Sequence, residues 1–158
     1  MDAIFDFKFS QKAIKILLVL IIAVFFMPFF FVSCSEGDAG ADFSGFEIST
    51  GKYIGDYWQQ GSLFGFALIV LPAVSLVFSF FAAKNGMLRA ICRYLFFIAP
   101  IFDVFAAFVA WKAFLASASA KFGQIPVTVG IKPGFVFYMI LNAALFAAGV
   151  ANYFAKRE

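Results

Sequence analysis

Asp103 is the residue best placed to do chemistry inside a membrane, because it is the only acidic residue deep within a long apolar run. Four small residues share its face of the predicted helix: Ala99, Ala106, Ala107 and Ala110. Small residues mark close contact between membrane helices, so we expect the Asp103 carboxyl to point into a helix bundle. Counting from the ends of the predicted helices places Asn142 and Ser75 within about two turns of its depth. The three residues form a candidate polar cluster.

Two interpretations of this candidate cluster are open. In the first, Asp103 is protonated or hydrogen-bonded to Asn142, and the polar contacts of the cluster stabilise the packing of the bundle. In the second, Asp103 binds a proton or a cation in a small transporter, where intramembrane acids are often found. The sequence contains no second buried acid, no detectable inverted repeat and little polar lining for a path. These features favour the first interpretation.

No other pattern in the chain points to catalysis or to a cofactor. There is no His, the commonest metal ligand and general base, and there is no nucleotide loop, G-x-S-x-G motif or metal-ligand spacing. The formal net charge is +3 and the basic residues are scattered, which does not favour a nucleic-acid partner. We therefore expect a protein that is not an enzyme, with no catalytic residue, no metal and no cofactor.

The two cysteines, Cys34 and Cys92, fall on opposite sides of the membrane in the predicted topology, so they form no disulfide with each other. Lys12 and Lys15 precede an apolar run that ends at Cys34 and somewhat resembles a lipoprotein cleavage box. Lipid attachment at Cys34, after cleavage before it, is therefore the alternative interpretation. The run is longer than a typical export signal, so we favour an uncleaved helix.

The composition predicts a membrane protein. Of the 158 residues, 64% are hydrophobic and 13% are charged, and the mean hydropathy is +0.97, so the chain has more apolar surface than one soluble core could hide. Four apolar runs have the length that a hydrocarbon core of about 30 Å demands. They predict an all-α bundle of four transmembrane helices, at about 13–35, 62–83, 94–115 and 133–155. Pro72 and Pro100 do not exclude this, because neighbouring helices can satisfy the carbonyl groups that they leave free.

Orientation follows from the basic residues near the ends of these helices. One side carries eight: Lys8, Lys12, Lys15, Lys84, Arg89, Arg93, Lys156 and Arg157. The other side carries four: Lys52, Lys112, Lys121 and Lys132. The positive-inside rule then puts both chain termini in the cytoplasm. The absence of a disulfide framework and of N-glycosylation motifs favours a bacterial cytoplasmic (inner) membrane.

Two predicted outer loops, about 36–61 and 116–132, connect the helices on the other side. Apolar and other residues alternate from Ile125 to Lys132, a period of two that predicts a strand. A fainter alternation around Phe46 and Ile48 suggests a second strand. Because two strands alone are marginal in water, we expect these two loops to form a small β cap that rests on the helix ends. The alternatives are a coil that lies on the lipid headgroups and a strand edge that accepts a strand from a partner.

This outline, four helices with a small sheet outside the membrane, resembles that of claudin-like tetraspans. The paired extracellular cysteines and the tryptophan motif of that family are missing, and Trp58 alone does not replace them. The chain is therefore assigned to no family from its sequence.

The functional expectation follows from these features. We expect a non-enzymatic tetraspan that is a structural or accessory subunit of a membrane complex. Its partners would be the lipid bilayer and either a further copy of itself or another membrane subunit. The alternative is a small proton- or cation-coupled transporter that uses Asp103 within the bundle.

Overall fold

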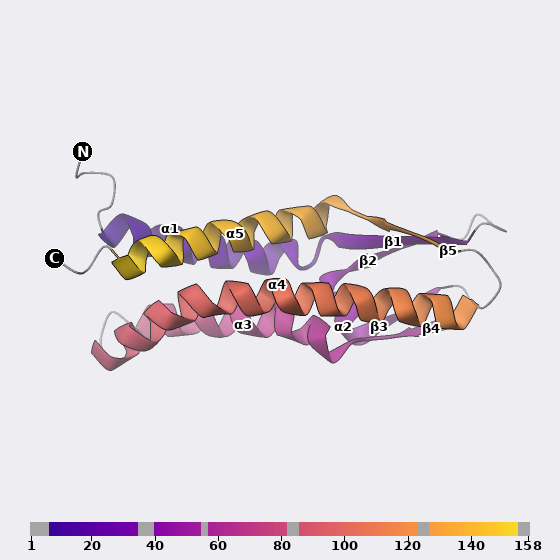
Figure 1. Cartoon of the computed structure of the whole chain (residues 1–158), viewed down its shortest axis with the longest axis horizontal. Coiled ribbons are helices and arrows are strands. Elements are labelled where there is room, and N and C mark those ends of the chain that lie inside the picture. Colours follow the sequence, from indigo (N-terminus) through magenta and orange to yellow (C-terminus); the bar gives the residue numbers. More distant parts are fainter. Residues whose placement is uncertain (1–6, 35–39, 55–56, 82–85, 123–126, 155–158) are drawn as a thin grey trace.

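The computed structural model describes residues 7–34, 40–54, 57–81, 86–122 and 127–154. These residues contain four long helices and one short helix: α1 (Phe7–Val24), α2 (Gly45–Thr50), α3 (Leu63–Phe81), α4 (Gly86–Phe122) and α5 (Pro133–Phe154). They also contain five strands: β1 (Pro28–Cys34), β2 (Gly40–Ser44), β3 (Gly51–Ile54), β4 (Tyr57–Gln60) and β5 (Val127–Ile131). The molecule is elongated, with the strands gathered toward one end (Figure 1). We call this the sheet end, and the end where α1 begins and α5 ends the terminal end.

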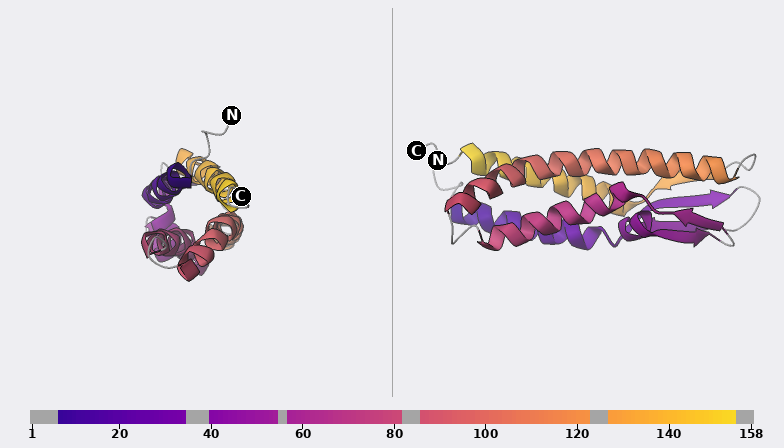
Figure 2. Two further views of the ribbon diagram at one scale, coloured as in Figure 1. Left: turned by 90° about the vertical axis from the view of Figure 1, so that its left-hand side faces the viewer. Right: turned by 90° about the horizontal axis from the view of Figure 1, so that it is seen from below.

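The four long helices form one bundle around a common axis (Figure 2). α1 contacts α3 and α5, and α4 contacts the same two helices, so the order around the axis is α1, α3, α4, α5. Among the described residues, three helical segments are long and apolar enough to cross a membrane: Leu63–Phe81, Ala90–Ala116 and Pro133–Tyr153. The chain thus has the architecture of a helical membrane protein.

The predicted first helix, at about 13–35, is wrong in its second half. α1 ends at Val24, and Pro28–Cys34 is strand β1. Proline has no N–H group to donate and disfavours helical conformation in the residue before it, so Pro28 opposes continuation of the helix. The aromatic and β-branched residues that follow suit a strand, and β1 finds partners on both of its edges.

α4 is much longer than the predicted 94–115. Its 37 residues correspond to about 55 Å, whereas a hydrocarbon core is about 30 Å thick. The helix therefore runs past the ends of its neighbours, and the strands lie along its second half (Figure 1). The predicted outer loop 116–132 consequently begins as helix. α3 and α5 occupy Leu63–Phe81 and Pro133–Phe154, against predictions of 62–83 and 133–155; residues 35, 82, 83 and 155 lie outside the described residues.

The principal sheet is antiparallel, with the order β2-β1-β5. In its centre Val32 of β1 pairs with Ala41 of β2 and with Val129 of β5. The strand predicted from Ile125 to Lys132 is present as β5, with residues 125 and 126 outside the described residues. Its partner is β1. The expected pairing with the segment around Phe46 is therefore wrong.

The strand predicted around Phe46 is wrong, because Gly45–Thr50 is helix α2. A capping box starts this helix: the Ser44 N–H donates to the Glu47 carboxylate (2.8 Å), and the Glu47 N–H donates to the Ser44 hydroxyl (3.3 Å). Lys52 forms an ion pair with the Glu47 carboxylate at 2.6 Å. Burial alone would raise the pKa of Glu47, but the bonds from Lys52 and Ser44 outweigh burial and lower this pKa. After α2, strands β3 and β4 form a separate hairpin.

A continuous group of aromatic rings joins the sheet to the bundle. We call it the aromatic seam; its members are Phe29, Phe30, Phe43, Trp111, Phe114 and Phe135. The Phe30 ring centroid lies 4.4 Å from Trp111, 5.5 Å from Phe114 and 5.1 Å from Phe135. Phe43 of β2 adds a contact to Phe114 at 5.0 Å. The hydrophobic core therefore passes without interruption from the helices into the sheet.

Candidate functional site: a buried polar layer

The register of α4 against α5 brings Asp103 and Asn142 to the same level. The two helices are antiparallel (Figure 1), and Gly149 of α5 lies directly against the Phe96 carbonyl oxygen of α4. Asp103 comes seven residues after Phe96, and Asn142 comes seven residues before Gly149. Both residues are thus displaced by about two turns in the same direction from the contact.

The register of α3 against α5 adds Ser75 to this layer. The Tyr138 hydroxyl crosses the bundle and donates to the Leu68 carbonyl oxygen at 2.9 Å. α3 and α5 run in the same direction (Figure 1), so Asn142 lies near the level of Pro72, and Ser75 follows three residues later. The predicted cluster therefore comes from three helices within about two turns along the axis. Asp103, Asn142 and Ser75 are at most 1% exposed.

The predicted hydrogen bond between Asp103 and Asn142 is not formed. The Asn142 side-chain amide instead donates to the Tyr138 carbonyl oxygen at 3.0 Å. Within the described residues, both Asp103 carboxyl oxygens, the Asn142 Oδ1 atom and the Ser75 hydroxyl have no hydrogen-bond partner. The layer thus presents buried oxygen atoms, while the Asn142 amide and the Tyr138 hydroxyl already donate to backbone carbonyls.

Two prolines, Pro72 of α3 and Pro100 of α4, explain the position of α5 along these two helices. Pro72 has no N–H group, so the Leu68 carbonyl oxygen four residues earlier loses its helical partner, and the Tyr138 hydroxyl replaces it. Pro100 frees the Phe96 carbonyl oxygen in the same way. Gly149 meets that oxygen at so short a range that a methyl group there would collide with it. The expectation that neighbouring helices satisfy these carbonyls is confirmed for Pro72.

Sequence reasoning missed further polar residues and expected too little polar lining. Ser79 and Asn152 are 3% and 2% exposed, and the Nε atom of Arg93 is also buried. The spacing along the helices could have predicted these buried residues, since Ser75 and Ser79 are four residues apart and therefore lie on one face of α3. Asn142 and Asn152 are ten apart on α5, about 80° around the helix, and both are buried.

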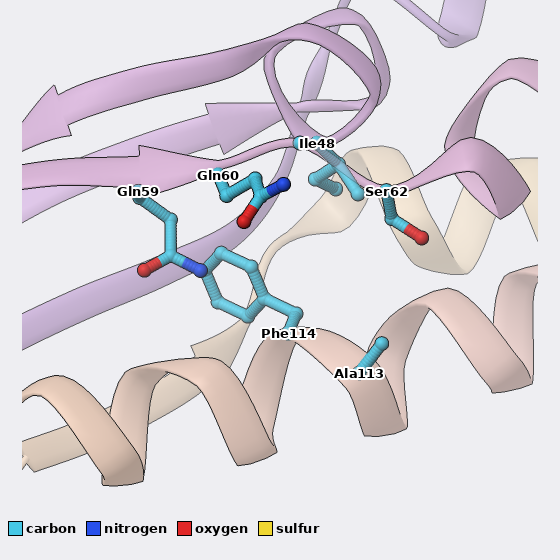
Figure 3. A pocket seen from close by; sticks show the side chains of 7 residues that line it. Ile48, Gln59, Gln60, Ser62, Ala113 and Phe114 are labelled. Atoms are coloured by element: carbon cyan, nitrogen blue, oxygen red, sulfur yellow. The ribbon is translucent and has the colours of Figure 1, made fainter.

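A separate pocket of about 200 Å³ lies where the β3–β4 hairpin and α2 meet α4 (Figure 3). Its lining is Ile48, Gln59, Gln60, Gly61, Ser62, Ala113 and Phe114. The side chains of Gln59 and Gln60 reach toward the Phe114 ring, and Gln59 is only 3% exposed. None of these lining residues is charged, so the pocket suits a neutral polar group.

The described residues contain no group of three His, Cys, Asp or Glu side chains that could hold a metal ion. Cys34 ends β1, where its backbone pairs with Val127, and lipid attachment to it stays a prediction. Cleavage before Cys34 would remove α1 and most of β1 from the core. No protein-family model, curated protein or solved structure matches the chain.

We predict that the Tyr138 hydroxyl stabilises the fold because Pro72 leaves the Leu68 carbonyl oxygen without a helical donor. Tyr138→Phe should lower the free energy of unfolding by about 1–3 kcal/mol, since the Leu68 carbonyl oxygen is then buried without a donor. The residue introduced by Pro72→Ala brings an N–H group, so Tyr138→Phe should cost much less in that background. Denaturation of the purified protein in detergent measures the four variants of this cycle.

Tyr94→Phe is the control, because Tyr94 is 56% exposed. An equal cost of Tyr138→Phe with Pro72 and with Ala at this position would contradict the assignment.

Proposed function

We propose that this chain is a non-enzymatic tetraspan membrane protein that acts as a structural or accessory subunit of a membrane complex. The observation that carries the proposal is the joining of the sheets to the bundle through α4 and the aromatic seam. Phe30 packs against Trp111 and Phe114 of α4 and against Phe135 of α5. A strand assembly held by such contacts keeps a fixed position relative to the membrane, as a recognition surface requires.

The proposal includes α1 as the fourth crossing helix. Lys8, Lys12 and Lys15 at its beginning make α1 less apolar than α3 and α5. Beyond Lys15, its outward face is apolar: Ile16, Val19 and Leu20 are 60%, 52% and 44% exposed. The Lys15 ammonium lies 4.6 Å from the centroid of the Phe80 ring of α3, a position compatible with the membrane boundary. Lipid is the favourable surrounding for such a face.

We further propose that the terminal end faces the cytoplasm of a bacterium and that the sheets form a β cap on the outer side. Lys12, Lys15 and Arg93 lie near the terminal end, and the full count of basic residues is eight against four. At the sheet end the ring centroids of Tyr53 and Trp58 lie 4.8 Å apart in the β3–β4 hairpin, and 64% and 44% of their surfaces are exposed. Exposed aromatic pairs of this kind suit the boundary of the membrane or a protein contact.

We predict that purification in a mild detergent recovers a stoichiometric partner, either another membrane subunit or a second copy of this chain. Tyr53→Ala combined with Trp58→Ala should reduce recovery of this partner, because the pair is exposed and contributes little to the core. Tyr94→Ala, at the terminal end, is the matched control. Quantitative mass spectrometry of the purified samples makes the comparison. A monomer with no partner that moves solute across vesicles would contradict the accessory role.

A second candidate function is a small proton- or cation-coupled transporter. It is favoured by one observation, the buried Asp103 carboxyl with no hydrogen-bond partner among the described residues. If this function holds, Asp103→Asn should abolish pH-dependent solute uptake into vesicles, whereas Asp42→Asn, outside the bundle, should not. A modest change in stability without any effect on uptake would contradict the transport function and would show that Asp103 only stabilises the packing of the helices.

A further inference from the structure

Unbonded polar atoms are concentrated in one half of the bundle. We call the part between the level of Asp103 and the terminal end the terminal half. Within the described residues, five of its side chains have a buried nitrogen or oxygen atom with no hydrogen-bond partner: Ser75, Arg93, Asp103, Asn142 and Asn152. Ser79 is buried there as well, and its hydroxyl donates to the Leu76 carbonyl oxygen.

These side chains follow one another along the axis. Ser79 comes four residues after Ser75, a rise of about 6 Å. Asn152 comes three residues after Gly149, and Arg93 comes three residues before Phe96, so the Gly149 contact places Asn152 and Arg93 at one level. Asp103 lies ten residues, or about 15 Å, from that level. Polar groups therefore occur at steps of about one turn from Asp103 toward the terminal end.

The opposite half of the bundle is apolar in its interior. The buried residues that the structure describes there include Ile21, Phe25, Phe29, Leu68, Ala106, Ala107 and Ala110. Among the described residues of the four long helices Tyr138 is the polar exception, and its hydroxyl is occupied by the Leu68 carbonyl oxygen; the buried Ser49 and Gln59 belong to α2 and β4. The aromatic seam closes this side toward the sheets.

Water is the partner that fits the unbonded atoms. A buried polar atom without a hydrogen bond costs free energy, and buried waters typically bridge such atoms when several lie within reach of one another. We propose that the terminal half holds a chain of water molecules ending at Asp103, and that Asp103 is a proton-binding site open to the terminal end alone.

The surroundings of Asp103 are compatible with proton binding. On α4 the nearest charged group toward the terminal end is Arg93, with the buried Cys92 beside it. α5 contributes Tyr138, while the interior face of α1 is apolar: Ile14, Leu18, Ile21 and Phe25. α3 contributes hydroxyl groups at Ser75 and Ser79. The inference does not depend on the accessory role, because it concerns only the interior of the bundle.

Silver ions, which are small enough for narrow water-filled passages and bind thiols, test the water chain. In a background with Cys34→Ser and Cys92→Ser, single cysteines replace Ser75 and Ser79 in the terminal half. Ala106→Cys and Ala110→Cys are the matched controls in the apolar half. After exposure of proteoliposomes to Ag⁺ in nitrate buffer, the remaining thiols are counted by maleimide labelling of the denatured protein.

We expect Ag⁺ to protect the cysteines at positions 75 and 79 roughly tenfold faster than those at 106 and 110. Equal rates in the two halves, or no protection at 75 and 79, would overturn the inference.

Infrared spectroscopy of the unsubstituted protein gives an independent reading. A carboxyl band absent from Asp103→Asn should appear on acidification and shift promptly in D₂O, because water reaches the carboxyl. A band that does not shift, or no difference from Asp103→Asn at any pH, would also overturn the proposal that water reaches a proton-binding Asp103.

Discussion

The backbone carbonyls that two prolines leave without helical donors constrain the whole bundle. In a membrane no bulk water can satisfy such groups, so the neighbouring helix must meet them. On α5 the Tyr138 hydroxyl donates to the Leu68 carbonyl of α3, and Gly149 allows the α5 backbone to lie close to the Phe96 carbonyl of α4. These two contacts fix how far α5 slides along its neighbours. The position of Asn142 opposite Asp103 is a consequence of that register.

α4 connects this register to the sheets. The same helix that carries Asp103 extends to Phe122 and supports β1 and β2 through Trp111 and Phe114. A shift of the helix at the polar layer would move the sheets by the same amount. The proposed proton site lies on α4, and the proposed recognition surface lies on the sheets that α4 supports, which gives a physical route by which the state of one could affect the other.

Sequence reasoning could find α3, α5 and β5, because their apolar length or alternation is unambiguous. It placed Asp103, Asn142 and Ser75 within about two turns, since helix ends and rise per residue suffice for depth. It could not separate β1 from α1, because an uninterrupted apolar run fits a buried strand as well as a helix, and the strand depends on pairing with distant β5. The Ser44 and Glu47 capping box was a local signal that the faint alternation around Phe46 obscured. Which polar atoms lack a partner depends on three helices together, so no single segment reveals it.

Spin-label accessibility along α1 tests most directly the proposal that four helices, α1 included, lie side by side in lipid. Single nitroxides at Ile16, Val19 and Leu20, with inward Ile14 and Leu18 as references, are measured in vesicles for collision with oxygen and with a water-soluble nickel complex. We expect the three outward positions to collide with oxygen and not with nickel, and the inward positions to collide with neither. Strong nickel collision at the outward positions would place α1 in water and contradict the four-helix account.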